Sequence, residues 1–323
     1  MRAAVYEQIG SSADVLRVQD VPKPEPGPGE VRIKIECSGV NPTDWKSRSG
    51  LTSRPIEGFQ IPHHDGAGVI DAVGEGVDPG RVGQRAWTWL AAAGRKWGTA
   101  AEWSVVPDRQ AIALPDGISG ELAASLGVPA MTAHRCLFAD GPVAGKTVLV
   151  AGGAGAVGHF AIELAKHAGA RVVTTVSGPE KAELAGKAGA DLVVNYKEPG
   201  AAEAIKEFGP VNRVVELALR ANLGLDLDVI APGSEIVTYA AEPGPDPSLV
   251  VRACMNANVV LRFVLLYGVP AEGMDQAAAD ITTALRDGAL TELPVHRYAL
   301  DDIVAAQDAV EAGAVGKVLV VPG

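Results

Sequence analysis

The chain has 323 residues, of which 47% are hydrophobic and 21% are charged; this is a globular composition, long enough for two domains. Its formal net charge of −11 argues against nucleic acid or an anionic membrane as the main partner, because both attract clustered lysines and arginines. Three widely spaced cysteines without a CxxC pair argue against a disulfide framework or a cysteine-rich zinc site, and they favour a reducing compartment.

No targeting or membrane segment is expected. The first residues, MRAAVYEQIG, lack the apolar region of a signal peptide. The most apolar later run, residues 259–269, carries Arg262 and is too short to span a bilayer. We therefore expect a soluble, cytoplasmic protein.

Residues 1–124 have the pattern of short strands joined by turns. The segments VRIKIECSGV, GAGVIDAVGEGV and AEWSVVP are strand-like, and segments rich in glycine and proline, such as PKPEPGPGE, separate them. This pattern predicts an antiparallel, barrel-like domain.

From about residue 125 the pattern changes to strands that alternate with helices. The apolar runs TVLVAG, ARVVTTV, ADLVVNY and NRVVELA precede the helical segments HFAIELAKHAG, PEKAELAGKAG, AAEAIKEFG and LGLDLDVIAPG, and SEIVTYA closes the series. Near-continuous apolar strands separated by helices indicate βαβ units in a buried parallel sheet. After residue 266 follow a helix (MDQAAADITTALRDG), a strand (PVHRYAL), a helix (DDIVAAQDAVEAG) and a last strand (GKVLVVP).

The first βα turn of this parallel sheet carries a dinucleotide-binding motif. Residues 153–158 read GAGAVG and match GxGxxG between a strand and a helix. Gly153 is expected to permit the tight turn, Gly155 to let the backbone approach a pyrophosphate, and Gly158 to let the helix lie close to the strand. The cofactor-binding turn is therefore predicted to consist of Gly153, Ala154, Gly155, Ala156, Val157 and Gly158, with the phosphates at the helix N-terminus.

The tip of the second strand favours NADPH over NADH. An NAD site usually has an acidic residue there, which holds the ribose 2′-hydroxyl, but this tip reads TVSGP. Ser177 can donate a hydrogen bond to a 2′-phosphate, and Lys181 supplies positive charge. Tyr196, which ends the third strand, is expected near the same ribose.

Several segments together resemble the zinc-independent quinone oxidoreductases (zeta-crystallin-like) of the medium-chain dehydrogenase/reductase superfamily. They are GVNP (39–42), DGAGV (65–69), GTAAEW (98–103), MTA (131–133), AGAVG (154–158), NY (195–196) and GK (316–317), and they cover nearly the whole chain. The resemblance implies an α/β protein with two domains. Residues 1–124 and 267–323 would form a GroES-like, partly open β-barrel catalytic domain, and residues 125–266 a Rossmann NADPH-binding domain with a doubly wound parallel sheet. It also implies an active site between the domains, and a homodimer or tetramer that pairs the Rossmann edge strand, residues 259–266.

The resemblance also bears on metal binding. Zinc-dependent relatives use a cysteine, a histidine and a cysteine or aspartate as catalytic ligands, and only His64 matches here. The first and third positions hold Asn41 and Val128, and residues 87–103, where those relatives carry structural cysteines, contain none. Because a catalytic zinc site needs three protein ligands, we expect no metal. His64 then either lines the substrate cleft or packs beneath it as a structural histidine.

Without a metal, a hydrogen-bond donor must polarise the substrate carbonyl while hydride leaves C4 of the nicotinamide. By resemblance, Asn41 is the first candidate. Lys46 stands where many family members have a tyrosine; it could donate a proton, bind an acidic substrate or point into solvent. Trp45 and Tyr267 are expected at the substrate. The resemblance further places Asn41, Thr132, Tyr239, Phe263 and Lys317 at the cofactor, with core packing as the alternative for the aromatic side chains.

We therefore expect an NADPH-dependent, metal-independent reductase of a conjugated carbonyl: a quinone, an α,β-unsaturated ketone or an enoyl thioester. A carbonyl or alcohol oxidoreductase of a biosynthetic pathway is one alternative, and a non-catalytic NADPH-binding protein is another. Pocket-lining loops, residues 45–59 and 87–97, would set the substrate, and four of the five tryptophans (45, 87, 89 and 97) lie in them. These tryptophans would suit a flat aromatic substrate, although core packing would explain them equally well.

Overall fold

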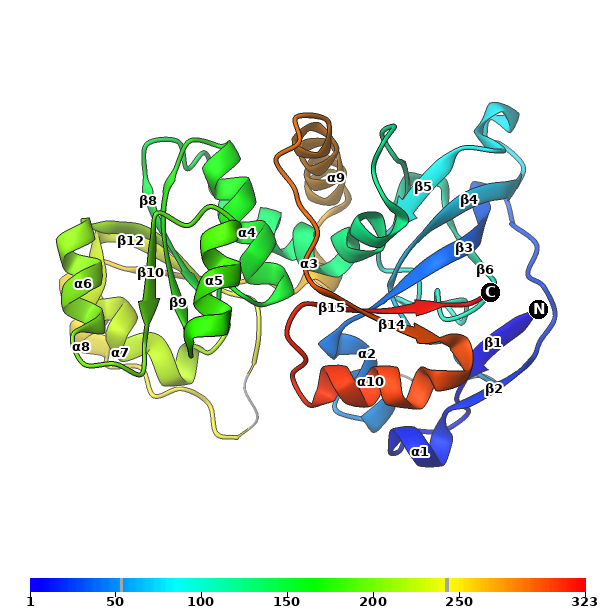
Figure 1. Ribbon diagram of the computed structural model, residues 1–323, viewed down its shortest axis with the longest axis horizontal. Helices are drawn as coiled ribbons and strands as arrows, with labels where there is room; N and C mark the ends of the chain where they lie inside the picture. The colour runs from blue at the N-terminus through cyan, green and yellow to red at the C-terminus, as the bar shows by residue number, and fades with distance from the viewer. Residues whose placement is uncertain (53–54, 242–243) are drawn as a thin grey trace. The chain divides into compact units, whose positions relative to one another are not determined.

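Two units of different architecture make up the chain in the computed structural model, which describes residues 1–52, 55–241 and 244–323 (Figure 1). The first unit consists of residues 1–128 and 292–323, and the second of residues 129–291. Helix α3 (Gly120–Phe138) contains the boundary between them. Residues 53 and 54 of the expected substrate loop lie outside the described residues.

The first unit is built on a mostly antiparallel sheet. Its strand order is β14–β15–β3–β4–β5–β7, with β6 paired to β3, and only β14 and β15 run parallel. The strands are β3 (Glu30–Val40), β4 (Asp65–Val73), β5 (Arg85–Thr88), β6 (Trp103–Pro107), β7 (Ala111–Ala113), β14 (Val295–Ala299) and β15 (Lys317–Val321). A separate pair, β1 (Arg2–Val5) and β2 (Arg17–Asp20), and the helices α1 (Ser12–Val15), α2 (Pro42–Ser49) and α10 (Ile303–Glu311) complete this unit.

The alternation of buried apolar and exposed charged residues along β3 explains how this sheet forms a core on one face. Ile33 and Ile35 are buried, whereas Lys34 and Glu36 between and beyond them are exposed, as expected for a strand with one face toward a core. The buried face packs against residues of β4, β5, β6 and β7. A second core joins β1, α10 and β15.

The second unit is a six-stranded parallel sheet with the order β10–β9–β8–β11–β12–β13, which is the Rossmann arrangement. The strands are β8 (Thr147–Ala151), β9 (Arg171–Val176), β10 (Leu192–Asn195), β11 (Val211–Glu216), β12 (Ile230–Thr238) and β13 (Val260–Phe263). Parallel pairing brings all six carboxyl ends to one edge of the sheet. The strand order reverses between β8 and β11, where such sheets bind their ligands.

Helices cover this sheet in two groups. Helices α4 (Ala156–His167) and α5 (Pro179–Lys187) pack together, and α6 (Ala201–Phe208), α7 (Leu219–Val229) and α8 (Val251–Ala257) pack in a row (Figure 1). Right-handed crossovers from β8 outward and from β11 outward place the two groups on opposite faces. None of the helices among the described residues is long and apolar enough to cross a membrane.

Helix α9 (Ala271–Arg286) lies in the second unit, so the chain returns to the first unit at residue 292 and not at residue 267 as expected. The physical reason is its packing. Its buried face includes Ala277 and Ile281, it contacts α4, and His134 of α3 lies 2.8 Å (Nε2–Oδ2) from its Asp280. An amphipathic helix between two domains does not show in its own sequence which core it joins.

Candidate active site

A buried polar cluster lies where three strands of the first unit meet. Asn41 directly follows β3, Asp65 begins β4 and Lys317 begins β15. The register pairs Gly39 with Asp65 and Val40 with Val318, which brings the three side chains together. Asn41 and Lys317 are each 2% exposed and Asp65 is fully buried. Of the residues predicted for the site, Asn41 and Lys317 are therefore in direct contact in the structure.

Short hydrogen bonds connect this cluster. Lys317 Nζ donates to Asn41 Oδ1 at 2.7 Å, and Asn41 Nδ2 donates to Asp65 Oδ2 at 2.7 Å. Asp65 Oδ1 accepts from the backbone N–H of Val128 at 2.7 Å, and Lys317 Nζ lies 3.6 Å from Asp65 Oδ2. The backbone N–H of Asn41 donates to Asp44 Oδ2 at 2.7 Å, which caps α2.

Burial governs the charges of the cluster. Burial raises the pKa of Asp44 well above its usual range, and the nearby charge of Asp65 raises it further, while the Asn41 N–H and the charge of Lys317 oppose the rise. Burial also raises the pKa of Asp65, but Lys317, Asn41 and the Val128 N–H oppose that rise. Burial lowers the pKa of Lys317, while Asp65 and Asp44 counteract it. Lys317 and Asp65 form a buried ion pair, which the Asn41 carboxamide and the Val128 N–H help to compensate.

The two adjacent histidines lie beside this cluster. His63 is fully buried and has a left-handed backbone (φ 75°), which is unusual for a residue with a side chain. Its Nδ1 lies 2.9 Å from Ser38 Oγ, and burial lowers its pKa to about 3. His64 is also buried, with Nε2 3.9 Å from Asp44 Oδ1. Within the described ranges no three His, Cys, Asp or Glu side chains form a group that could hold a metal ion.

Helix α2 carries Trp45 and Lys46, the expected substrate and proton-donor residues. Both are partly exposed, and Lys46 Nζ lies 5.9 Å from the centre of the Trp45 ring. Arg48 of the same helix donates from Nε to Gln307 Oε1 of α10 at 2.7 Å, which fixes α2 to α10.

In the second unit, the glycine-rich turn joins β8 to α4 at the carboxyl edge of the sheet. Gly153 is expected from the sequence to permit the tight turn, but the left-handed residue of the turn is Gly152 (φ 70°). A Cβ on Gly153 would lie 2.1 Å from Thr174 Oγ1 of β9, so this glycine permits close packing on the neighbouring strand. A Cβ on Gly158 would lie 2.3 Å from Gly152 O, which bears out the expected close approach of helix and strand.

Gly155 differs from its neighbours. A Cβ there would meet only Gly152 O, at 3.4 Å, so the fold itself leaves the space above this residue open. The next residues, Ala156 and Val157, begin α4, and the first N–H groups of a helix have no partner in a preceding turn. This part of the turn can accept a pyrophosphate, as the GxGxxG pattern predicts.

Two residues predicted for the 2′-phosphate stand at neighbouring strand ends. Ser177 directly follows β9, and Tyr196 directly follows β10 and is 50% exposed. Lys181 lies in the first half of α5 and is partly exposed. The tip of β9 carries no carboxylate between Thr175 and Pro179. The cofactor contacts of these side chains stay predictions.

The other predicted residues of the second unit are more widely spread. Tyr239 directly follows β12 and is partly buried, which raises the pKa of its hydroxyl. Phe263 ends β13 and is 71% exposed. Tyr267 lies in a short 3-10 turn, Leu266–Gly268, and Thr132 is buried in α3. The structure places Tyr239 and Phe263 at the carboxyl edge and leaves the roles of all four as predictions.

A buried pair of carboxyl groups at the carboxyl edge of the parallel sheet was not predicted from the sequence. Glu216 ends β11 and Asp226 lies in α7, and both are almost fully buried. Glu216 accepts from the backbone N–H of Ala218 and from Asn222 Nδ2 at 3.0 Å. Burial raises the pKa of Asp226 well above its usual range, and the charge of Glu216 raises it further. An acid that closes an apolar strand, as in NRVVEL, was the signal available in the sequence.

Known proteins resemble both units. Residues 27–116 match the family model "Alcohol dehydrogenase GroES-like domain", and residues 156–283 match "Zinc-binding dehydrogenase". The quinone oxidoreductase of Lama guanicoe is 31% identical over 99% of this chain and 97% of its own length.

Solved structures resemble the chain over its whole length. A mycobacterial protein complexed with NADPH is 33% identical, with a TM-score of 0.86 and full coverage of both chains. A quinone oxidoreductase of Pseudomonas syringae is 27% identical, with a TM-score of 0.87 and 99% coverage of both chains.

We predict that His63 makes stability pH-dependent. Its pKa is lowered from 6.5 to about 3 in the folded state, so its contribution is complete above pH 6.5 and is lost as the pH falls toward 3. The unfolding free energy of the wild type, minus that of His63→Asn, should decrease by about 1.4 kcal/mol per pH unit below pH 6.5. Asparagine tolerates the left-handed backbone.

Urea denaturation of both proteins between pH 7.5 and pH 5 measures this difference. Taking the difference cancels the other titrating groups. A difference that stays constant with pH would show that His63 is protonated in the folded state or accessible to water.

Proposed function

The chain belongs to the quinone oxidoreductase family of the medium-chain dehydrogenase/reductase superfamily, and we propose that this NADPH-dependent oxidoreductase reduces a conjugated carbonyl compound without a catalytic metal. The substrate would be a quinone, an α,β-unsaturated ketone or an enoyl thioester. The observation that carries the proposal is the buried Asn41 carboxamide between Lys317 and Asp65. An amide donor stands there, where zinc-dependent relatives would need a metal ligand.

The second unit has the features of a dinucleotide site. The open space above Gly155 and the start of α4 would hold the pyrophosphate, with the N–H groups of the first helical turn as donors. NADPH supplies a hydride from C4 of its nicotinamide ring. The mycobacterial relative was solved as a complex with NADPH, which supports the same cofactor here.

Three side chains would favour NADPH over NADH. Ser177 and Tyr196 follow neighbouring strands, and Lys181 follows in α5. They could hold a 2′-phosphate by hydrogen bonds and charge. A carboxylate at the tip of β9 would repel this phosphate, and none is present between residues 175 and 179.

In the first unit, Asn41 would stabilise the charge that develops on the substrate oxygen. When hydride adds to the β-carbon, the electron pair of the double bond moves toward the carbonyl oxygen, and an Nδ2–H donor stabilises that oxygen. A proton must then reach the α-carbon. Lys46 or water would supply it. Trp45, His64 and Tyr267 are proposed to border the substrate.

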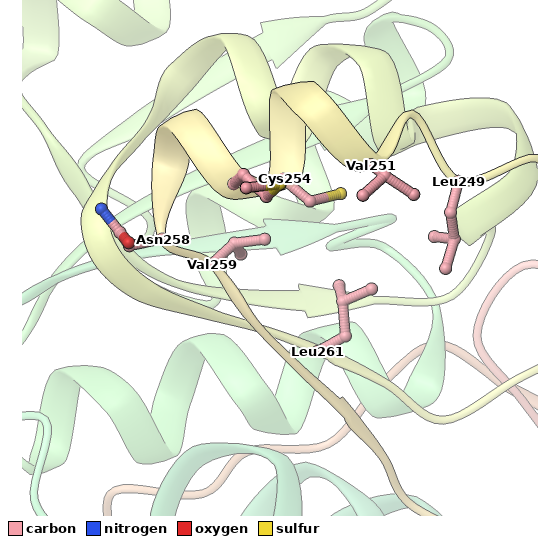
Figure 2. Close-up of a pocket in the computed structure, with 7 residues that line it drawn as sticks. Leu249, Val251, Cys254, Asn258, Val259 and Leu261 are labelled. Carbon is pink, nitrogen blue, oxygen red and sulfur yellow. The ribbon is translucent and has the colours of Figure 1, made fainter.

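We also propose a homodimer, or a tetramer built from such dimers, through the β13 edge of the sheet. β13 pairs only with β12 among the described strands, and Val260 and Phe263 on it are 50% and 71% exposed. Beside it lies a hollow of about 520 Å³ between α8 and β13 (Figure 2), lined by Leu249, Val251, Cys254, Met255, Asn258, Val259 and Leu261. An exposed apolar edge strand invites pairing with a second strand, and a second copy would supply one.

Replacing Val260 tests this interface. Val260→Asp should shift the chain from dimer to monomer in sedimentation velocity, because it buries a charge in the strand pairing. Val82→Asp is the matched control, since Val82 is also 50% exposed but lies in the first unit. A wild type that sediments as a monomer would contradict the proposed dimer.

Gly155→Ala tests the cofactor site. The added methyl group should be tolerated by the fold, with a change in unfolding free energy below about 0.5 kcal/mol, but it would occupy the space for the pyrophosphate. We expect the Kd for NADPH to rise at least about tenfold, or about 1.4 kcal/mol. Gly186→Ala in α5, where a Cβ would meet no other atom within 4 Å, should bind NADPH normally. Unchanged binding by Gly155→Ala would place the cofactor elsewhere.

A substrate panel tests the activity. NADPH oxidation would be followed with a benzoquinone, a naphthoquinone, a cyclic enone, an enoyl thioester and a simple ketone, and repeated with NADH and with a chelator. We expect quinones or enones to be reduced faster with NADPH than with NADH, at a rate that the chelator does not change. Turnover of the simple ketone alone would indicate a carbonyl reductase. NADPH binding without any turnover would indicate a binding protein.

A further inference from the structure

The carboxamide of Asn41 is held at both ends by groups of opposite hydrogen-bonding character. Its Oδ1 accepts from Lys317 Nζ, and its Nδ2 donates to Asp65 Oδ2, both at 2.7 Å. An ammonium group can only donate and a carboxylate can only accept. Turning the amide over would therefore place donor against donor and acceptor against acceptor. The orientation of the Asn41 carboxamide is therefore fixed by the donor and acceptor character of its two partners as well as by the shape of the site.

One Nδ2 hydrogen of Asn41 is used by the bond to Asp65, and a carboxamide has two. The second hydrogen takes a direction that Lys317 and Asp65 together determine. A hydrogen-bond donor that is already oriented before the reaction stabilises developing charge most effectively, because no reorientation is needed.

The partners of Asn41 are fixed in turn. Asp65 Oδ1 accepts from the Val128 N–H at 2.7 Å, which leaves Oδ2 for Asn41. Lys317 starts β15, and its Nζ also lies 3.6 Å from Asp65 Oδ2. Its side chain is only 2% exposed. Burying an ammonium group in this way is unfavourable unless an opposite charge and hydrogen bonds compensate it.

Two glycines leave room for this arrangement. A Cβ on Gly39 would lie 3.0 Å from Lys317 Cε and 2.1 Å from Ala124 O. A Cβ on Gly127 would lie 2.1 Å from Asp65 Oδ1. A side chain at either position would displace Lys317 or Asp65. Glycine at these two positions therefore leaves the space that the Lys317 and Asp65 side chains occupy.

We propose that Lys317 and Asp65 are positioning residues that orient the Asn41 carboxamide so that its second Nδ2 hydrogen is offered to the carbonyl oxygen of the substrate. The inference rests on the proposed function, in which Asn41 is that donor. It gives Lys317 a different task from the cofactor contact predicted from the sequence, because its ammonium group is buried against Asn41 and Asp65.

Kinetics of Lys317→Met give the first test. Methionine keeps much of the length of the side chain but cannot donate to Asn41, so the amide loses its fixed orientation. We expect kcat to fall about 10- to 100-fold, below or near the loss for removing an oxyanion donor outright. The Kd for NADPH should change by less than about twofold. Lys34→Met, on the exposed face of β3, is the matched control and should leave both values unchanged.

A double-mutant cycle separates positioning from a general structural role. In an Asn41→Ala background, Lys317→Met should cost less than about threefold in kcat, because the group that it positions is gone. Fully multiplicative losses would overturn the inference. A tenfold rise in the Kd for NADPH with kcat unchanged would do the same and would make Lys317 a cofactor ligand. If Lys317→Met does not fold, Asp65→Asn, which keeps the side-chain shape, takes its place in the cycle.

A second readout does not depend on turnover. In protein labelled with ¹⁵N-asparagine, the Asn41 carboxamide signals are those lost in Asn41→Ala, and we expect their hydrogens to exchange at least about tenfold faster in Lys317→Met. Faster exchange in a protein that reduces no substrate would leave the positioning intact and refute the proposed function. Unchanged exchange in an active enzyme would refute the positioning alone.

Discussion

The Lys317 ammonium group, removed from water beside Asp65 and Asn41, is the interaction on which the first unit depends. A buried charge of this kind is tolerated only when an opposite charge and further hydrogen bonds compensate it. Here the compensation comes from the ends of three strands and from the Val128 N–H of α3. Those elements must therefore meet within hydrogen-bonding distance. Gly39 and Gly127 follow from the same requirement, because a side chain at either position would separate them.

Two kinds of glycine shape the nucleotide turn in the second unit. Gly153 and Gly158 leave no space for a side chain, because β9 packs against Gly153 and the turn after β8 packs against Gly158. Gly155 has free space instead, so packing does not explain its lack of a side chain, and we propose that a bound pyrophosphate does. Glycines that look alike in the sequence motif thus differ in their surroundings, and only the structure separates them.

Much of this arrangement was predictable from the sequence. Apolar runs that alternate with amphipathic segments predicted the parallel sheet, and GxGxxG between a strand and a helix predicted the turn at its carboxyl edge. Local patterns carried these predictions, because strand and helix periodicity and turn chemistry depend on near neighbours. The family resemblance added Asn41 and Lys317, which no periodicity distinguishes.

The sequence could not predict contacts between distant segments. Arg48 bonds to Gln307 because α10, more than 250 residues later, reaches α2. The pairing of Glu216 with Asp226 depends on how α7 packs on β11. The assignment of α9 to the second unit depends on its contact with α4. In each case the contact partner lies in another helix or strand, so the tertiary fold determines it and the local sequence pattern does not.

The position of the transferred hydride tests the central claim most directly. NADPH labelled with deuterium at the transferring C4 position would be reacted with a cyclic enone, and the product would be examined by NMR. The account predicts a saturated ketone with deuterium on the former β-carbon, at a rate that Asn41→Ala lowers. An unsaturated alcohol with deuterium on the former carbonyl carbon would contradict it, because the enzyme would then reduce the carbonyl and not the conjugated double bond.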